Sequence, residues 1–136
     1  MATQLKLNSV VDHGVGGDAE AGVFDLIYSF LLNECGQNFY SAIVVNQIGD
    51  DLNEIILREG KRIHINIRYP VYEDFESKQF NEKNRIRLDV IHTSLLKIAE
   101  YEKKLDPQKL ETIRSKIIEQ DFKFHFLFGT KSEQGK

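Results

Sequence analysis

The chain has 136 residues, 41% hydrophobic and 29% charged, which is the composition of a folded domain rather than of a disordered chain. Its 18 Lys and Arg against 21 Asp and Glu residues give a formal net charge of −3, which argues against a protein whose main task is to bind the nucleic-acid backbone. The single cysteine excludes an intramolecular disulfide and any Cys-x-x-Cys zinc or redox site.

The first part of the chain predicts a strand, a loop and a helix. Apolar and polar residues alternate over 4–11, which indicates a strand, and the glycine-rich polar stretch over 12–18 indicates a loop. Asp18 suits the N-cap of a helix that runs to about Glu34, with Gly36 as its stop.

The middle of the chain predicts three strands. A β-branched run over 39–45 is typical of a strand, and a turn follows at 49–51. Residues 54–57 and 63–69 flank a connection that contains glycine, which predicts a hairpin. In its second arm two sets of side chains point to opposite faces: Ile63, Ile65 and Ile67 to one, and His64, Asn66 and Arg68 to the other.

A polar connector over 71–83 leads to two helices and a last strand. The period of the apolar residues predicts a helix over 84–104, and Asp106 followed by proline predicts the start of a second helix that ends near Gln120. Four phenylalanines alternate with Lys123, His125 and Leu127 over 122–128, which predicts a strand, and we expect 129–136 to be a flexible tail.

These elements predict one α+β domain over residues 1–136, in the order β-α-β-β-β-α-α-β. We expect a largely antiparallel sheet, with the two helices of the C-terminal half packed on the face that carries the isoleucines and phenylalanines. The N-terminus has no signal-peptide pattern, and the apolar stretch over 23–32 is too short to span a bilayer. We therefore expect a cytoplasmic protein without membrane contact, in which Cys35 is a free thiol.

Two acidic clusters are candidates for partner contact. Neither has the ligand pattern of a calcium loop, and no two histidines stand at metal-ligand spacing, so we expect no metal and no cofactor. The clusters are either solvated charge or a surface that meets a basic protein, and the aromatic residues beside the second cluster either anchor that contact or pack the connector onto the domain. The predicted partner-binding set is Asp50, Asp51, Tyr69, Tyr72, Glu73, Asp74, Phe75 and Glu76.

The histidines allow a catalytic alternative. If the two strands that carry them are neighbours, two histidines and two cations share one polar sheet face and could cleave a phosphodiester without a metal; otherwise the same face is solvated or contacts a protein. This set is His64, Arg68, Lys123 and His125. The remaining candidate is His92, on the apolar stripe of the long helix, which we expect to be held by Asp89 or Arg85.

Several segments between Glu54 and Phe128 carry a resemblance. They are the strand over 63–70, the aromatic and acidic residues 72–75, the helix start over 87–92 and the closing aromatic strand. With these segments the chain resembles small bacterial immunity-type proteins of polymorphic toxin systems. The resemblance implies a small, cytosolic, non-enzymatic and often acidic protein that binds and blocks a toxin.

The sequence thus favours a non-enzymatic protein-binding module, such as an immunity or inhibitor protein with a basic toxin as its partner. A small metal-independent nuclease or other hydrolase is the alternative. A small-ligand module with an aromatic pocket between sheet and helices is the third hypothesis.

Overall fold

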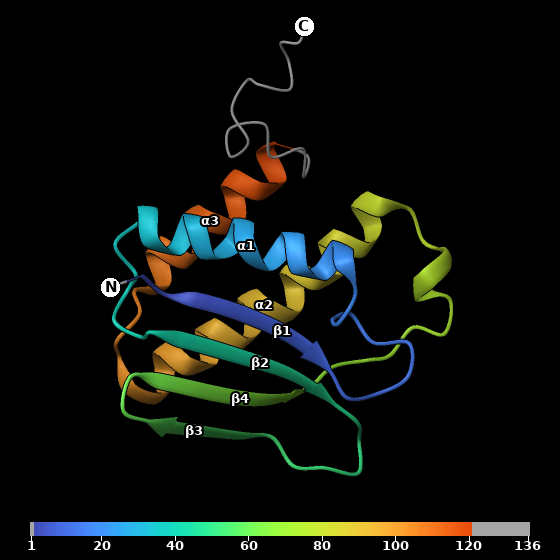
Figure 1. The fold of residues 1–136 in the computed structure, drawn as a ribbon, viewed down its shortest axis with the longest axis horizontal. Helices are drawn as coiled ribbons and strands as arrows, with labels where there is room; N and C mark the ends of the chain where they lie inside the picture. The colour runs from blue at the N-terminus through green and yellow to red at the C-terminus, as the bar shows by residue number, and fades with distance from the viewer. Residues whose placement is uncertain (1, 121–136) are drawn as a thin grey trace, which may run out of the picture.

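The computed structural model describes residues 2–120, which fold in the order β-α-β-β-β-α-α, with a 3-10 helix before the second α-helix (Figure 1). The elements are β1 (Gln4–Ser9), α1 (Ala19–Glu34), β2 (Ala42–Ile48), β3 (Ile55–Glu59), β4 (Arg62–Arg68), η1 (Phe75–Ser77), α2 (Phe80–Glu102) and α3 (Pro107–Glu119). The α+β class is confirmed, as is the predicted order up to α3. The predicted strand over 122–128 and the tail over 129–136 lie outside the described residues.

The four strands form one sheet in the order β1-β2-β4-β3. Strand β2 pairs in parallel with both β1 and β4, and β3 pairs antiparallel with β4. The prediction of a largely antiparallel sheet is therefore wrong. A parallel pair needs a long crossover, which α1 supplies between β1 and β2. The chain then passes β4's position to form β3 at the edge, and the hairpin brings β4 back beside β2.

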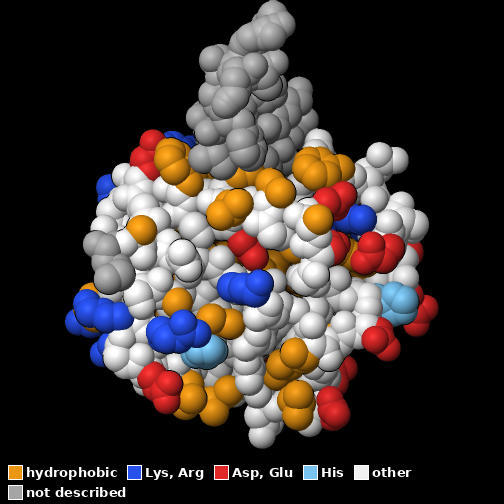
Figure 2. Space-filling model, in the orientation of Figure 1, with side chains coloured by type: hydrophobic (Ala, Val, Ile, Leu, Met, Phe, Trp, Pro, Cys, Tyr) orange, Lys and Arg blue, Asp and Glu red, His pale blue; other side chains and the backbone are white. Residues whose placement is uncertain are grey.

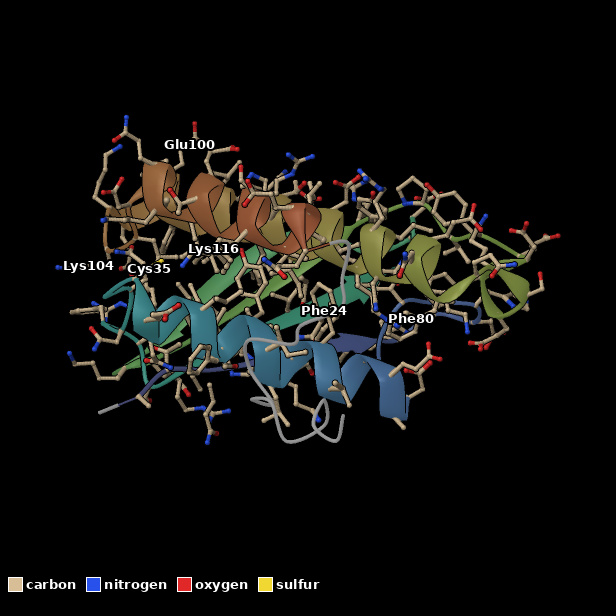
Figure 3. All side chains as sticks on the ribbon, turned by 90° about the horizontal axis from the view of Figure 1, so that it is seen from above. Phe24, Cys35, Phe80, Glu100, Lys104 and Lys116 are labelled. Atoms are coloured by element: carbon tan, nitrogen blue, oxygen red, sulfur yellow. The ribbon has the colours of Figure 1, made fainter. Side chains whose placement is uncertain are left out.

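One face of this sheet carries the core. The register aligns Leu5 with Ile43 and Ile43 with Ile63, and all three side chains are buried. The predicted inward direction of Ile63, Ile65 and Ile67 is confirmed. Helix α2 packs across β2 and β4, and α1 lies along β1. Helix α3 packs mainly on α1 and α2 rather than on the sheet, so the prediction of two C-terminal helices on the sheet face holds for α2. Figure 3 shows α1 and α3 side by side. Lys116 Nζ on α3 lies 3.5 Å from Glu34 Oε1 at the end of α1.

The outer edge of β1 is closed by polar side chains of α1. The backbone N–H groups of Thr3, Leu5 and Leu7 point away from β2. They donate to Asn33 Oδ1 (2.9 Å), Ser29 Oγ (2.8 Å) and Asp25 Oδ2 (3.2 Å). These three side chains stand four residues apart on α1, a distance of about 6 Å along a helix, which matches about 6.6 Å for every second residue of a strand. We call this set, Asp25, Ser29 and Asn33, the edge ladder.

The helix ends follow local sequence signals. Asp18 Oδ1 accepts from Ala21 N at the start of α1 (2.8 Å), and Gly36 takes a φ of 74° just after its end. Asp106 Oδ1 likewise accepts from Gln108 N at the start of α3 (2.9 Å). Helix α2 starts four residues earlier than the predicted residue 84, because Gln79 and Glu82 form a capping box before Phe80.

Candidate partner-binding surface

The two acidic clusters lie at the same edge of the sheet. Asp50 and Asp51 follow β2, and the segment over 69–76 follows β4, its parallel neighbour, so both clusters extend from the carboxyl ends of adjacent strands. The acidic side chains of both clusters are exposed. Figure 2 shows acidic side chains gathered at the right of the molecule, where these loops lie in Figure 1. The topology thus places at one end of the sheet two clusters that are about twenty residues apart in sequence. We call these five exposed acidic residues and the two partly exposed tyrosines the carboxyl-end surface: Asp50, Asp51, Tyr69, Tyr72, Glu73, Asp74 and Glu76.

A buried glutamine fixes the loops beneath this surface. Gln47, near the end of β2, is fully buried and bonds to the loops that follow both neighbouring strands. Its Oε1 accepts from Val15 N (2.9 Å) and Ser9 Oγ (3.1 Å), and its Nε2 donates to the backbone oxygens of Tyr69 (3.1 Å) and Pro70 (3.3 Å). One buried amide therefore ties the loops after β1 and β4 to the strand between them.

The glycine-rich loop after β1 is packed closely onto the sheet. A Cβ at Gly14 would stand 1.4 Å from Ser9 Oγ, and one at Gly16 would stand 2.5 Å from the Leu7 carbonyl oxygen. The segment is the loop that the sequence predicts, and these two glycines allow its close packing. Its glycines, Gly14, Gly16 and Gly17, lack the spacing of a phosphate-binding loop.

A buried arginine holds the N-terminus of α1 and the loop before it to α2. Arg87 is 0% exposed, and its Nη2 donates to both carboxylate oxygens of Asp18 at 3.1 Å. Its Nε donates to the Val15 carbonyl oxygen (2.8 Å), and its Nη1 donates to Asn84 Oδ1 (2.9 Å) and Glu20 Oε1 (3.4 Å). Every donor face of the guanidinium is used, as a buried charge requires.

Phe75 does not belong to the accessible surface. Its ring is 0% exposed and lies 5.3 Å from the Arg87 guanidinium carbon and 5.7 Å from Lys83 Nζ. The prediction that Phe75 contacts a partner is therefore corrected: it packs the connector onto the domain. Lys83 also forms ion pairs with Glu20 (3.7 Å) and Glu76 (3.6 Å). The second of these holds the acidic segment over 73–76 to α2.

Tyr69 and Tyr72 are half-buried and held in place. Tyr69 donates its hydroxyl to Asp89 Oδ2 (3.2 Å), and burial, with the Asp89 carboxylate beside it, raises the pKa of Tyr69 above its ordinary value. Lys78 Nζ lies 5.3 Å from the centre of the Tyr72 ring and 3.6 Å from Asp74 Oδ1. Both rings thus present one side to solvent beside the acidic residues.

Two of the four residues of the catalytic alternative lie in the part of the chain that the structure describes. His64 and Arg68 point away from the core on β4, as predicted, while Lys123 and His125 lie outside the described residues, so their approach to His64 stays a prediction. His92 is buried as expected, but its Nε2 lies 2.9 Å from Glu111 Oε2 on α3, and not against Asp89 or Arg85.

The open face of the sheet carries an arrangement that the sequence did not reveal. Asn8, Asn46 and Asn66 occupy one row across β1, β2 and β4. Asn8 Nδ2 donates to Asn46 Oδ1 (3.1 Å), and Asn46 Nδ2 donates to Asn66 Oδ1 (3.0 Å). The only signal would have been their equal position in each strand, which becomes visible once the pairing is known.

Other site types find little support in the part of the chain that the structure describes. Residues 2–120 hold no group of three or more His, Cys, Asp or Glu side chains placed to bind a metal ion. None of their helices has the length and apolar character that crossing a bilayer demands. Five hollows among these residues are open and lie at the surface, and none of the five is an enclosed aromatic pocket between sheet and helices.

Comparisons of this chain with protein-family models, with characterised proteins and with solved structures give no match.

Proposed function

We propose that this chain is a non-enzymatic protein-binding module whose partner docks on the carboxyl-end surface. The observation that carries the proposal is that two acidic clusters follow the carboxyl ends of adjacent parallel strands, and that buried Gln47 and Arg87 hold neighbouring loops in place. The segment over 69–76, which Gln47, Lys83 and Arg87 hold in place, loses little conformational freedom on binding, so less of the contact energy is spent on ordering it.

The chemistry of the surface favours a basic partner. The surface carries five exposed carboxylates, and those of Glu73, Asp74 and Glu76 follow two half-buried tyrosines in the chain. Acidic surfaces of this kind accelerate the approach of a basic protein more than they tighten the final complex. The tyrosines supply apolar area with a polar rim, which is typical of residues that contribute most to binding energy.

The resemblance to immunity-type proteins makes the proposal more specific. It suggests a basic bacterial toxin as the partner, inhibition by direct binding, and a cytoplasmic location where the toxin would otherwise act. What supports this narrower proposal is the resemblance of the segments over 63–70, 72–75 and 87–92, together with the acidic surface formed next to them.

The test is co-expression of the full chain with the protein encoded by the adjacent gene, read out as cell growth and as the association rate of the purified pair. Charge reversal of the surface uses the triple variant Asp50→Lys, Asp51→Lys and Glu73→Lys. The matched control, Glu59→Lys, Glu100→Lys and Glu119→Lys, changes the net charge equally at exposed positions elsewhere.

We expect the surface variant to slow association by about 10-fold or more and to remove its salt dependence, while the control changes the rate by less than about 3-fold. Equal effects of the two variants, or full binding by the surface variant, would contradict this location of the binding site.

The hydrolase alternative keeps one supporting observation. His64 lines an open hollow of about 260 Å³ with Glu59, Asn46 and Asn66 on the open sheet face. Cleavage of a single-stranded RNA by the full chain, lost in both His64→Ala and His125→Ala, would favour this function, and no cleavage would remove it.

A further inference from the structure

The two edges of the sheet differ in whether their outward backbone groups have hydrogen-bond partners. The edge ladder of α1 occupies the outer N–H groups of β1, whereas no strand or helix side-chain ladder within residues 2–120 pairs with the outer edge of β3. Strand β3 contains three consecutive apolar residues, and two of them are strongly exposed: Ile55 is 51% and Leu57 54% accessible. An unpaired edge with exposed apolar side chains is a surface on which another strand can add.

The free edge also has a defined hydrogen-bonding pattern. Gly60 and Lys61 form a two-residue turn, so Glu59 and Arg62 face each other as the first pair of the hairpin. Hydrogen-bonded groups alternate along an antiparallel strand, so Ile56 and Arg58 direct their N–H and C=O groups outward. Consistently, Arg68 on β4 sends its N–H toward β3, where Glu54 Oε2 accepts it at 2.9 Å.

Hollows lie on both sides of this edge. On the helix side a hollow of about 290 Å³ is lined by Ile55, Ile56 and Tyr101, among others, and on the open side the hollow of about 260 Å³ is lined by Ile55, Leu57 and His64, among others. In strand addition the backbone supplies hydrogen bonds and alternate side chains of the added strand enter such spaces on the two faces.

The sequence of the edge indicates which strand fits. Residues 54–58 read Glu-Ile-Ile-Leu-Arg, so an acidic and a basic residue stand at equal distances on either side of Ile56. When two copies pair antiparallel with Ile56 opposite Ile56, Glu54 of each copy faces Arg58 of the other. In the same register Ile55 faces Leu57, so apolar side chains meet apolar side chains. The outward backbone groups of Ile56 then bond to each other across the two-fold axis.

We propose that two copies of this chain associate through β3, antiparallel and centred on Ile56, so that their sheets become continuous. Each pair of charges across the interface joins an existing contact of α2: Lys97 Nζ is 3.1 Å from Glu54 Oε1, and Arg58 Nε is 2.9 Å from Glu102 Oε1. The association uses the edge of β3, whereas the acidic segment over 73–76 follows β4.

The decisive test is a charge swap measured by sedimentation velocity on the full chain. Glu54→Arg places like charges opposite each other, as does Arg58→Glu, and each variant alone should dimerise about 10-fold more weakly or worse than the native chain. An equimolar mixture of the two variants should recover native-like association, because every cross-axis pair is again of opposite sign. Glu59→Arg is the control, since it faces Asn53 in this register and should leave dimerisation unchanged.

A second measurement keeps the proposal falsifiable if Glu54→Arg disturbs the fold, which circular dichroism would show. In a Cys35→Ser background, Ile56→Cys should form an intermolecular disulfide under mild oxidation, because opposite residues in this register lie about 5.5 Å apart. Leu52→Cys, at an exposed position before the strand, should not.

A native chain that remains monomeric at millimolar concentration overturns the proposal. So does a dimer that the mixture fails to restore, because that result would place the contact between the two copies elsewhere than at Glu54 and Arg58. Either result leaves the carboxyl-end surface untouched, so the two proposals fail independently.

Discussion

Asp25 is expected to make the stability of this protein depend on pH. The carboxyl group is 8% exposed, its Oδ2 accepts from Leu7 N (3.2 Å), and its Oδ1 has no hydrogen-bond partner among the described residues. Burial is the main cause that raises its pKa from 3.8 to about 7, against the Leu7 hydrogen bond and the charges of Lys6 and Arg87, which lower it. Burial of the Asp25 carboxyl group in the edge ladder therefore costs less free energy when the group is neutral than when it is charged.

The linkage between proton binding and folding gives the sign and the size of this pH dependence. Between pH 3.8 and about 7 the folded chain retains a proton on Asp25 that the unfolded chain releases, so the free energy of unfolding falls as the pH rises through this range. A pKa difference of about 3 corresponds to about 4 kcal/mol, which is an upper bound. Below pH 4 the contribution is fully present, and above pH 7 to 8 it is fully lost.

Asp25→Asn separates this effect from the rest of the protein. Asparagine keeps an acceptor for the Leu7 N–H and stays neutral, so the variant should gain about 1 to 3 kcal/mol over the native chain at pH 8 and little or nothing at pH 4. Urea unfolding between pH 4 and 9 measures this, with the exposed Asp12→Asn as a control within about 0.5 kcal/mol of the native chain. Parallel pH profiles of native and Asp25→Asn protein would refute the reasoning.

Three further predictions concern the framework. Gly14→Ala should lower the free energy of unfolding by about 2 kcal/mol or more, because the added Cβ would collide with Ser9 Oγ. Gly22→Ala, whose added Cβ would meet nothing within 4 Å beyond its neighbours in the helix, should raise it by about 0.5 to 1 kcal/mol, and urea titration compares the two variants. Arg87→Met should cost about 3 to 5 kcal/mol by leaving Asp18 and Glu20 without their buried partner, and equal stability of variant and native chain in thermal unfolding would contradict the role of Arg87. Asn46→Ala should cost about 1 to 2 kcal/mol through the two amide hydrogen bonds on the open face, measured against Asn38→Ala, an exposed asparagine for which less than about 0.5 kcal/mol is expected.

Local signals made much of the fold predictable from sequence. The N-caps at Asp18 and Asp106 and the isoleucine alternation of β4 depend on residues close together in the chain, and all are confirmed. Pairing was not predictable in the same way, because side-chain alternation is the same in parallel and antiparallel sheets. The strand–helix–strand run from β1 to β2 did contain a hint of a parallel pair, since such a crossover is what parallel neighbours need.

For the carboxyl-end surface, the sequence predicted most of the residues but not how the fold arranges them. The acidic residues were identified from sequence, but their placement at one end of the sheet depends on β2 and β4 being adjacent, and no local sequence pattern marks the buried Gln47 and Arg87. Phe75 was misplaced because an aromatic residue in an acidic connector has the same sequence context whether it faces solvent or the core. Its burial follows from a long-range contact with Arg87.

The edge ladder has a consequence for the solution behaviour of the chain. A sheet that can gain strands at both sides can in principle propagate into a fibre, whereas a sheet sealed at one side can add at the other side once and then stops. Asn33, which bonds to both the N–H and the C=O of Thr3, therefore helps to prevent a further strand from adding at β1. Weakening the contacts between α1 and β1 would allow the proposed association through β3 to continue at the second edge.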